Sequence, residues 1–215
     1  MPPLRIATPG RVDYAAALSA QEQLVADVHA GADDALILLE HPPVYTLGRG
    51  GDEAHLREAS SGTIPILRVG RGGQVTYHGP GQLVGYPILN LRHHRQDVRW
   101  YVRTLEEVLI AALARVDVAA DRRPGCPGVW VDGVRKIASI GVGIRRWVTW
   151  HGFALNVGPD LTGFEAITPC GISGVTMTSI ARERGMADPD TVRTIVQEEF
   201  VRILGYKATT LLQLR

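Results

Sequence analysis

Apolar residues recur along the chain with two different spacings. A spacing of three to four positions is typical of amphipathic helices, and it predicts helices over Asp13 to His29, Asp97 to Val116 and Pro189 to Leu204. The run from Ala35 to Leu39 is continuously apolar, which is typical of a strand buried on both faces. A short helix is expected to begin at Thr178 or Ser179. Further strands are expected at Leu4 to Ile6, Val44 to Leu47, Leu83 to Leu89, Val129 to Val131, Val134 to Ile144 and Trp147 to Val157.

The order of these elements favours a particular fold class. Helices and strands mix without strict alternation, and no repeat, low-complexity segment or interdomain linker separates them. This arrangement predicts an α+β or mixed α/β fold rather than a doubly wound parallel sheet. A length of 215 residues suits one domain with a sizeable core, so residues 1–215 are expected to form a single domain.

Composition and charge narrow the possible functions. The chain is 45% hydrophobic and 21% charged with a formal net charge of +1, so no overall basic field argues for nucleic acid. No apolar run is long enough to cross a bilayer, and the N-terminal MPPLRIATPG has no signal-peptide core. Its two cysteines form neither a CxxC motif nor a disulfide framework. Cytoplasmic residence without a membrane partner is therefore expected.

The stretch from Arg71 to Gln82, RGGQVTYHGPGQ, is the densest concentration of glycine and polar side chains. Glycines here would suit a pair of tight turns between strands. Turns alone do not need the imidazole, phenol and amides that the stretch also carries. Its polar side chains predict a ligand cradle: Gln74, Thr76, Tyr77, His78 and Gln82.

Cys170 is the candidate nucleophile. Pro169 fixes the chain before it and Gly171 allows a turn after it, a setting that can hold an accessible thiol rigidly. The alternative is a small buried hydrophobe, the usual role of a free cysteine. Cys126 lies in a Gly-Cys-Pro loop with no candidate base nearby in the sequence, and we interpret it as incidental.

Lys136 is the candidate acid–base group. Alternation along its strand places it on the face of Ala138, Ile140 and Val142, where an unpaired ammonium would be costly. It could lie near the strand end and extend to water. In a functional role, a desolvated lysine would take a proton from a thiol and return it later.

No cofactor is expected from the remaining candidates. The pair His93-His94 and His151 do not form a zinc spacing with cysteine or acid, so no metal is expected. The loops Gly48 to Gly51 and Arg71 to Gly73 are not P-loops, since no Gly-Lys-Ser/Thr follows them.

The assembled motifs closely resemble the lipoyl(octanoyl) transferases, the octanoyltransferases of lipoate biosynthesis. The resemblance runs from about Ala35 to Ile180. It rests, in chain order, on LLEHPPVYTLGRG, RGGQVTYHGPGQLVGYPILNL, GVWVDGVRKIASIGVGI, HGFALNV and PCGISGVTMTSI. Several spaced motifs are far more specific than one glycine-rich loop.

The resemblance implies a fold, a reaction and a site. The fold is that of lipoate and biotin ligase catalytic domains: a mixed sheet flanked by helices, with a smaller second sheet. The reaction moves an octanoyl group from acyl carrier protein to a lysine of a lipoyl domain, without ATP. Cys170 matches the acyl-thioester nucleophile and Lys136 the lysine that activates it. The resemblance implies that the acyl site is lined by Arg71, Gly72, Gly73, Gln74, Val75, Thr76, Tyr77, His78, Ser139, Ile140, Gly141, Gly152, Phe153 and Ala154.

Two other functions remain open. An ATP-dependent lipoate–protein ligase would share the fold, although it would not need the cysteine of the PCGI motif. A non-catalytic protein that binds acyl chains or lipoyl domains would need neither Cys170 nor Lys136. For the transferase, we expect amides of Gly141, Gly152 and Gly171 at the developing oxyanion. Because both protein partners are acidic, a local basic surface at Arg49, Arg145 and Arg146 is also expected.

Overall fold

The computed structural model describes residues 3–56, 62–158, 160–168 and 175–214. Its helices are α1 (Tyr14–His29), α2 (Val98–Ala114), α3 (Ile180–Arg184) and α4 (Pro189–Leu204), with short 3-10 turns η2 (Leu91–His93) and η3 (Thr162–Phe164). The strands are β1 (Leu4–Arg11), β2 (Ala35–Glu40), β3 (Val44–Leu47), β4 (Ile66–Arg68), β5 (Val75–His78), β6 (Gln82–Ile88), β7 (Asp121–Arg123), β8 (Cys126–Val131), β9 (Arg135–Arg145), β10 (Val148–Asn156), β11 (Thr176–Met177) and β12 (Thr209–Leu211).

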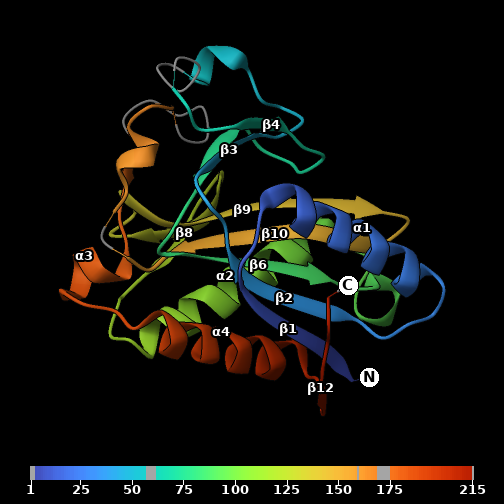
Figure 1. The fold of residues 1–215 in the computed structure, drawn as a ribbon. Coiled ribbons are helices and arrows are strands. Elements are labelled where there is room, and N and C mark those ends of the chain that lie inside the picture. The colour runs from blue at the N-terminus through green and yellow to red at the C-terminus, as the bar shows by residue number, and fades with distance from the viewer. Residues whose placement is uncertain (1–2, 57–61, 159, 169–174, 215) are drawn as a thin grey trace.

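A mixed main sheet forms the body of the protein (Figure 1). Its strand order is β12-β1-β2-β6-β10-β9-β8-β7, and β11 pairs with β9. The pairs of β1 with β2 and with β12 are parallel, whereas the pairs from β2 through β6, β10, β9 and β8 to β7 are antiparallel. A tight turn at Asp132 and Gly133 joins β8 to β9, and both residues have the positive φ that such turns require.

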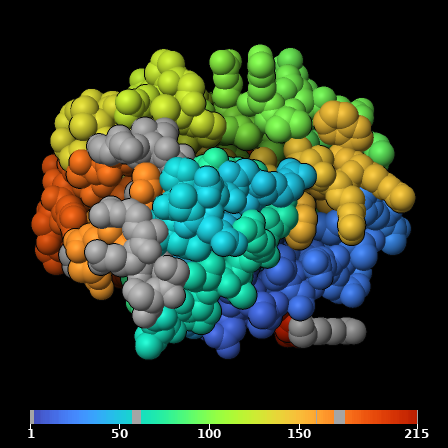
Figure 2. Space-filling view, turned by 90° about the horizontal axis from the view of Figure 1, so that it is seen from above, coloured from blue at the N-terminus to red at the C-terminus, as the bar shows by residue number. Residues whose placement is uncertain are grey.

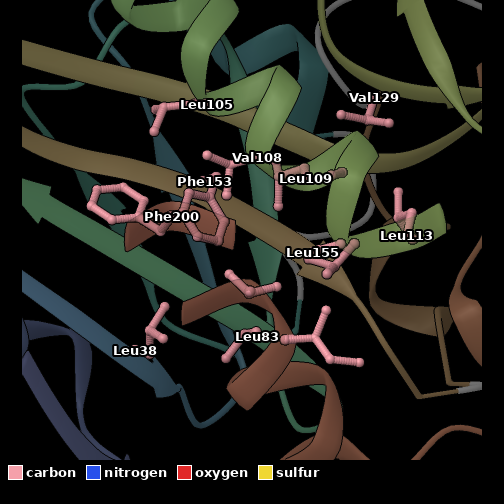
Figure 3. Close-up of a cluster of buried hydrophobic side chains, with 14 of the residues drawn as sticks. Leu38, Leu83, Leu105, Val108, Leu109, Leu113, Val129, Phe153, Leu155 and Phe200 are labelled. Atoms are coloured by element: carbon pink, nitrogen blue, oxygen red, sulfur yellow. The ribbon is translucent and has the colours of Figure 1, made fainter. Parts of the chain in front are cut away.

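Helices cover both faces of this sheet, so its central strands are buried on both sides. In β2, Leu36 and Leu38 pack toward the core shared with α2 and α4, whereas Ala35, Ile37 and Leu39 pack toward α1. Figure 1 shows α2 and α4 on one face and α1 on the other. Figure 3 shows the larger core, where leucines of α2 meet Phe153, Leu155 and Phe200. Burial on both faces explains why the sequence of β2 is continuously apolar.

The predicted helices begin where the sequence supplies caps. Asp97 accepts hydrogen bonds from the amides of Arg99 and Trp100 at the start of α2. Asp188 caps α4, and Gly205 ends it with a left-handed φ of 75°. Ser179 caps α3, as one of its two predicted starts. Within the described ranges, no helix is both long enough and apolar enough to cross a membrane.

A smaller second sheet, of order β4-β3-β5, lies beside the main one. With it, the predicted fold class is confirmed: a mixed sheet flanked by helices and a second small sheet. Two local predictions were wrong. Val75 to His78, expected in a loop, pairs with β3 as a strand. Asp121 to Arg123, where no strand was expected, pairs with β8. Both strands are short and depend on partners that their own sequence does not reveal.

Candidate active site

A cavity of about 460 Å³ lies where the loop before β5 meets the middle of β9 and β10. In the space-filling view, a hollow lies between the cyan segment near residue 50, the green α2 region and the gold turn between β9 and β10 (Figure 2). The cavity is lined by Tyr14, Arg49, Arg71, Gly72, Gly73, Gln74, Val75, Thr76, His78, Val84, Tyr86, Val98, Val102, Gly125, Cys126, Pro127, Lys136, Ser139, Ile140, Gly141, Val142, His151, Gly152, Phe153 and Ala154.

The glycine-rich loop forms one wall because it lies directly on β9. The amide of Gly72 donates to the carbonyl oxygen of Val142 at 2.8 Å. A Cβ at Gly141 would lie 3.0 Å from Cδ of Arg71, so glycine at 141 gives this side chain its place. The guanidinium of Arg71 is buried and donates to the carbonyl oxygen of Thr46 at 2.7 Å. Arg71 therefore fastens the loop to β3 while it brings a positive charge to the wall of the cavity.

His78 is held by a buried polar chain that runs across three strands. Its Nδ1 lies 2.7 Å from Oε1 of Gln82, whose Nε2 donates to Oδ1 of Asn156 at 2.9 Å. Nδ2 of Asn156 donates to the carbonyl oxygen of Thr178 at 2.9 Å. Because Oε1 of Gln82 is an acceptor, Nδ1 of His78 carries the proton. Burial, with smaller effects of nearby His41 and Arg71, lowers the pKa of His78 to about 3, so the ring is neutral at physiological pH.

A second buried group surrounds His151 at the cavity. Burial, followed by the charge of Arg71, lowers the pKa of His151 to about 3. Among the described residues, neither ring nitrogen of His151 has a hydrogen-bond partner. Its backbone adopts a positive φ of 53° and its amide donates to Oε1 of Gln21. Tyr86 lies against His151, and Tyr14 stacks on His78 in the same cavity. Burial raises the pKa of Tyr14 to about 12. The uncharged rings give this part of the cavity polar walls without added charge.

Lys136 is buried in the cavity wall. Its side chain does not extend to water: the residue is 3% exposed, and Nζ donates to the carbonyl oxygen of Pro127 at 2.9 Å. The ring of Trp130 lies 5.1 Å from Nζ and gives a cation–π contact. The carbonyl of Pro127 and the ring of Trp130 therefore fix the position of Nζ at the wall of the cavity.

One peptide group links Lys136 to the carboxylate of Glu106 on α2. The carbonyl oxygen of Pro127 accepts from Lys136, and the amide of Gly128, on the same peptide, donates to Oε1 of Glu106 at 3.0 Å. Arg122 donates to the other oxygen of this buried carboxylate at 3.1 Å. Gly128 has a φ of +123°, and a Cβ there would lie 2.7 Å from Cε of Lys136. Glu106 therefore fixes the plane of the peptide that holds the lysine.

The chain after residue 174 runs beside Lys136. In the pairing of β11 with β9, Met177 lies opposite Lys136, and the amide of Thr178 donates to the carbonyl oxygen of Lys136. The predicted nucleophile Cys170 and the predicted oxyanion donor Gly171 lie outside the described residues. Gly141 and Gly152, the other predicted oxyanion donors, pair directly across β9 and β10.

Comparison with known proteins shows which family the chain matches. Residues 13–201 match the family described as the lipoyl protein ligase A/B catalytic domain. An octanoyltransferase of Nostoc sp. is 49% identical over 199 residues, which cover 91% of this chain and 90% of that protein. An octanoyltransferase of Syntrophotalea carbinolica is 55% identical over 177 residues, which cover 82% of each chain.

The chain belongs to the octanoyltransferase family. The predicted resemblance and the predicted class of enzyme, an acyltransferase, are confirmed by this membership.

Solved structures agree with the octanoyltransferase fold. A bipartite lipoate protein ligase from Thermoplasma acidophilum is 17% identical with a TM-score of 0.77, over 99% of this chain and 88% of that chain. A lipoate-protein ligase A bound with ATP is 17% identical with a TM-score of 0.76, over 98% and 89% of the two chains. Biotin protein ligase from Leishmania major gives a TM-score of 0.55 at 11% identity, over 95% and 76%. At these identities the likeness concerns the fold alone.

The structure gathers most of the site residues predicted for this octanoyltransferase. Of the fourteen predicted substrate-binding residues, all but Tyr77 line the cavity, and so does Lys136. Tyr77 instead packs with Tyr45 and Phe164 in the core of the small sheet. Alternation along β5 places Tyr77 on the face opposite Thr76 and His78. Val75 shares the face of Tyr77 and lies in the same core, and it also borders the cavity where the strand begins.

Alternation along β9 is also less regular than predicted. The pairing of β8 with β9 shifts register between Lys136 and Ala138. Lys136, Ile140 and Val142 line the cavity, while Ala138, Ile140 and Val142 lie in or against the core shared with α2. The extra residue of such a bulge breaks the two-residue period on which the prediction depended.

Several cavity residues were not predicted from the sequence. Cys126, interpreted as incidental, lines the same cavity as Lys136 and precedes the proline that binds it. Tyr14, Tyr86 and His151 also line it. Their sequence surroundings are those of an ordinary helix and ordinary strands, so only the fold reveals their position. Within the described ranges, no group of three or more His, Cys, Asp or Glu is placed to hold a metal ion.

Proposed function

We propose that this octanoyltransferase carries the octanoyl group on Cys170 as a thioester between two protein substrates. The donor is octanoyl-acyl carrier protein. The acceptors are specific lysines of lipoyl domains, in 2-oxoacid dehydrogenases and in the H protein of glycine cleavage. The work is done by residues 1–215 as one catalytic domain, in the cytoplasm, without ATP, metal or another cofactor.

In the first step, the sulfur of Cys170 attacks the carbonyl carbon of the carrier's phosphopantetheine thioester. The new sulfur–carbon bond forms, the old one breaks, and the carrier leaves as a free thiol. Lys136 accepts the proton of Cys170 and delivers a proton to the departing thiolate. Dividing the transfer in this way replaces one difficult attack by two easier ones.

In the second step, the amine of the acceptor lysine attacks the Cys170 thioester. A nitrogen–carbon bond forms, the enzyme thioester breaks, and Lys136 takes the amine's proton and returns one to Cys170. Amides of Gly141, Gly152 and Gly171 are proposed donors to the oxyanion that develops in each step.

One observation carries this proposal: a buried lysine lines a cavity beside the strand that follows the PCGI motif. Lys136 is 3% exposed and lies opposite Met177 in β11. The backbone path from residue 175 thus supports a place for Cys170 close to Lys136. The apolar side chains of Val84, Ile140 and Phe153 suit an acyl chain in the same cavity.

The test is transfer in the absence of ATP. The protein is incubated with octanoyl-acyl carrier protein and a lipoyl domain, without ATP or magnesium. The mass of the lipoyl domain is then measured by mass spectrometry. An octanoylated acceptor is expected. Product that appears only with ATP and free octanoate would replace the proposal by the ligase function, and no product under either condition would favour a binding protein without catalysis.

A further inference from the structure

A groove of about 1200 Å³ adjoins the cavity along α2 and β7. Five residues line both hollows: Val98, Val102, Gly125, Cys126 and Pro127. Val98 is 46% exposed although it is apolar. The groove and the cavity therefore form one continuous path, and the part that they share is largely apolar.

Arginines dominate the outer part of this groove. The groove is lined by Arg95, Arg99, Arg103, Arg122 and Arg123. Figure 2 shows green side chains from this part of the chain projecting from the surface beside the hollow. A long path that runs from several guanidinium groups to a partly apolar cavity suits a ligand with an anionic group at one end and an apolar chain at the other.

The carboxylates of the groove are largely occupied within the protein. Asp97 accepts from the first amides of α2, and Glu106 is buried and bound to Gly128. Asp121 accepts from the amide of Arg122. Among the described residues, Glu107 is the one lining carboxylate with no hydrogen bond or ion pair. Five arginines face four carboxylates, so the groove is weakly basic.

Three of the arginines have no ion pair with a carboxylate among the described residues: Arg99, Arg103 and Arg123, all of them exposed. Arg123 instead lies over the ring of Trp130, 4.8 Å from its centroid. Guanidinium groups without an internal ion pair are well suited to bind phosphate or carboxylate with two parallel hydrogen bonds.

We propose, resting on the function proposed above, that this groove docks octanoyl-acyl carrier protein. Arg99 and Arg103 face the acidic surface of the carrier, and Arg123 faces the phosphate of its phosphopantetheine arm. The arm passes over Val98 and Val102 into the cavity. The acceptor fits the groove less well, because the lysine that a lipoyl domain presents carries no phosphate for Arg123 to bind.

The test compares charge reversal in the groove with charge reversal elsewhere. The variants are Arg99→Glu/Arg103→Glu and Arg123→Glu, and the control is Arg193→Glu on α4. At low salt, both groove variants should raise KM for octanoyl-acyl carrier protein about tenfold, since rim charges chiefly set the rate of encounter. Their KM for the lipoyl domain and the KM values of the control should stay at the wild-type level, and the salt dependence of KM for the carrier should weaken.

Small donors separate docking from chemistry. With octanoyl-pantetheine, which lacks both phosphate and protein, the double variant should turn over like the wild type. With octanoyl-phosphopantetheine, Arg123→Glu should raise KM while the double variant should not. An unchanged KM for the carrier in both variants, or the same loss of turnover with all three donors, would overturn the docking site. A rise in KM for the lipoyl domain instead would assign the groove to the acceptor and also overturn it.

Binding is measured as well, so that the two proposals can fail separately. Fluorescence anisotropy with labelled octanoyl-acyl carrier protein and the Cys170→Ala protein should show weaker binding after Arg99→Glu/Arg103→Glu. If the wild type transferred no octanoyl group from any donor but bound the carrier through these arginines, the proposed function would fail and the docking site would stand. If the affinity for the carrier were the same in both groove variants as in the wild type, the docking site would be wrong, whatever the turnover.

Discussion

The link between Glu106 and Lys136 can be broken by one substitution. Glu106→Leu removes the acceptor of the Gly128 amide, while Glu106→Gln keeps an oxygen in the same place. If the carboxylate fixes the peptide that holds Lys136, only the leucine variant should let Lys136 move. Glu107, its exposed neighbour on α2, offers the matched control Glu107→Leu.

The expected magnitudes follow from burial. Gly128 is buried, so its amide would be left without a partner, at a cost of about 1–3 kcal/mol in the free energy of unfolding. The side chain of Arg122 is 40% exposed, so losing its half of the pair adds less than about 1 kcal/mol. For turnover, a displacement of Lys136 by about 1 Å would cost between tenfold and a hundredfold. Glu106→Gln should lose only about 1 kcal/mol and keep most of its activity.

The assay uses octanoyl-pantetheine as the donor, because Glu106 also borders the groove proposed to dock the carrier. Urea unfolding gives the stability of each variant, and kcat/KM is measured against pH at a temperature where all are folded. Glu106→Leu should lower kcat/KM and shift its pH profile, whereas Glu106→Gln and Glu107→Leu should not shift the profile. Turnover within twofold of the wild type in folded Glu106→Leu, with an unchanged profile, would refute the positioning of Lys136 through this peptide.

Three further predictions concern the same cavity. Lys136→Arg keeps the positive charge but cannot give up its proton in the pH range where the enzyme works. It and Lys136→Ala should each cut turnover at least about a hundredfold, while both variants still fold and bind the carrier. Near-normal turnover of Lys136→Arg would show that the charge alone suffices. Gly128→Ala places a Cβ 2.5 Å from the carbonyl oxygen of Ala138 and 2.7 Å from Cε of Lys136, so it should lose stability and also reduce turnover about tenfold, the scale of a displaced catalytic group. Gly133→Ala, at φ +68° with no atom within 4 Å, should lose stability only. Equal turnover in the two folded variants would contradict this. Burial holds the pKa of His78 and His151 at about 3, below the unfolded value of about 6.5, so the unfolded chain binds more protons below that pH. The free energy of unfolding should therefore fall as pH drops from about 6.5, by up to about 1.4 kcal/mol per pH unit for each histidine. Urea unfolding between pH 7 and pH 5 should show a shallower pH dependence of this free energy in His151→Asn than in the wild type, and equal slopes would count against a buried neutral His151.

The helices were predictable because their signals are local. The predicted helix from Pro189 to Leu204 has the bounds of α4, and Asp13 to His29 differs from α1 only by its cap residue. The strand β5 was not predicted, because four residues between glycines carry little pattern and its partner β3 lies about thirty positions earlier. Pairing over that separation depends on the whole fold.

The site was predictable only as far as its residues share a motif. The resemblance supplied Lys136 and the loop from Arg71 to Gly73, and the fold places them around one cavity. It supplied Tyr77 along with its neighbours, although the face on which Tyr77 lies is set by the alternation of a strand that had been expected as a loop. Cys126 and Glu106 come near Lys136 through the pairing of β8 with β9 and the packing of α2, which sequence neighbours do not reveal.

The central claim is that Cys170 carries the octanoyl group, and the intact mass of the protein tests it most directly. After incubation with octanoyl-acyl carrier protein and no acceptor, without ATP, the protein should gain the mass of one octanoyl group. Hydroxylamine should remove that mass, peptide mapping should place it on Cys170, and Cys170→Ala should gain none. An adduct on Cys126, or no adduct while the wild type still transfers octanoyl to a lipoyl domain, would contradict the account.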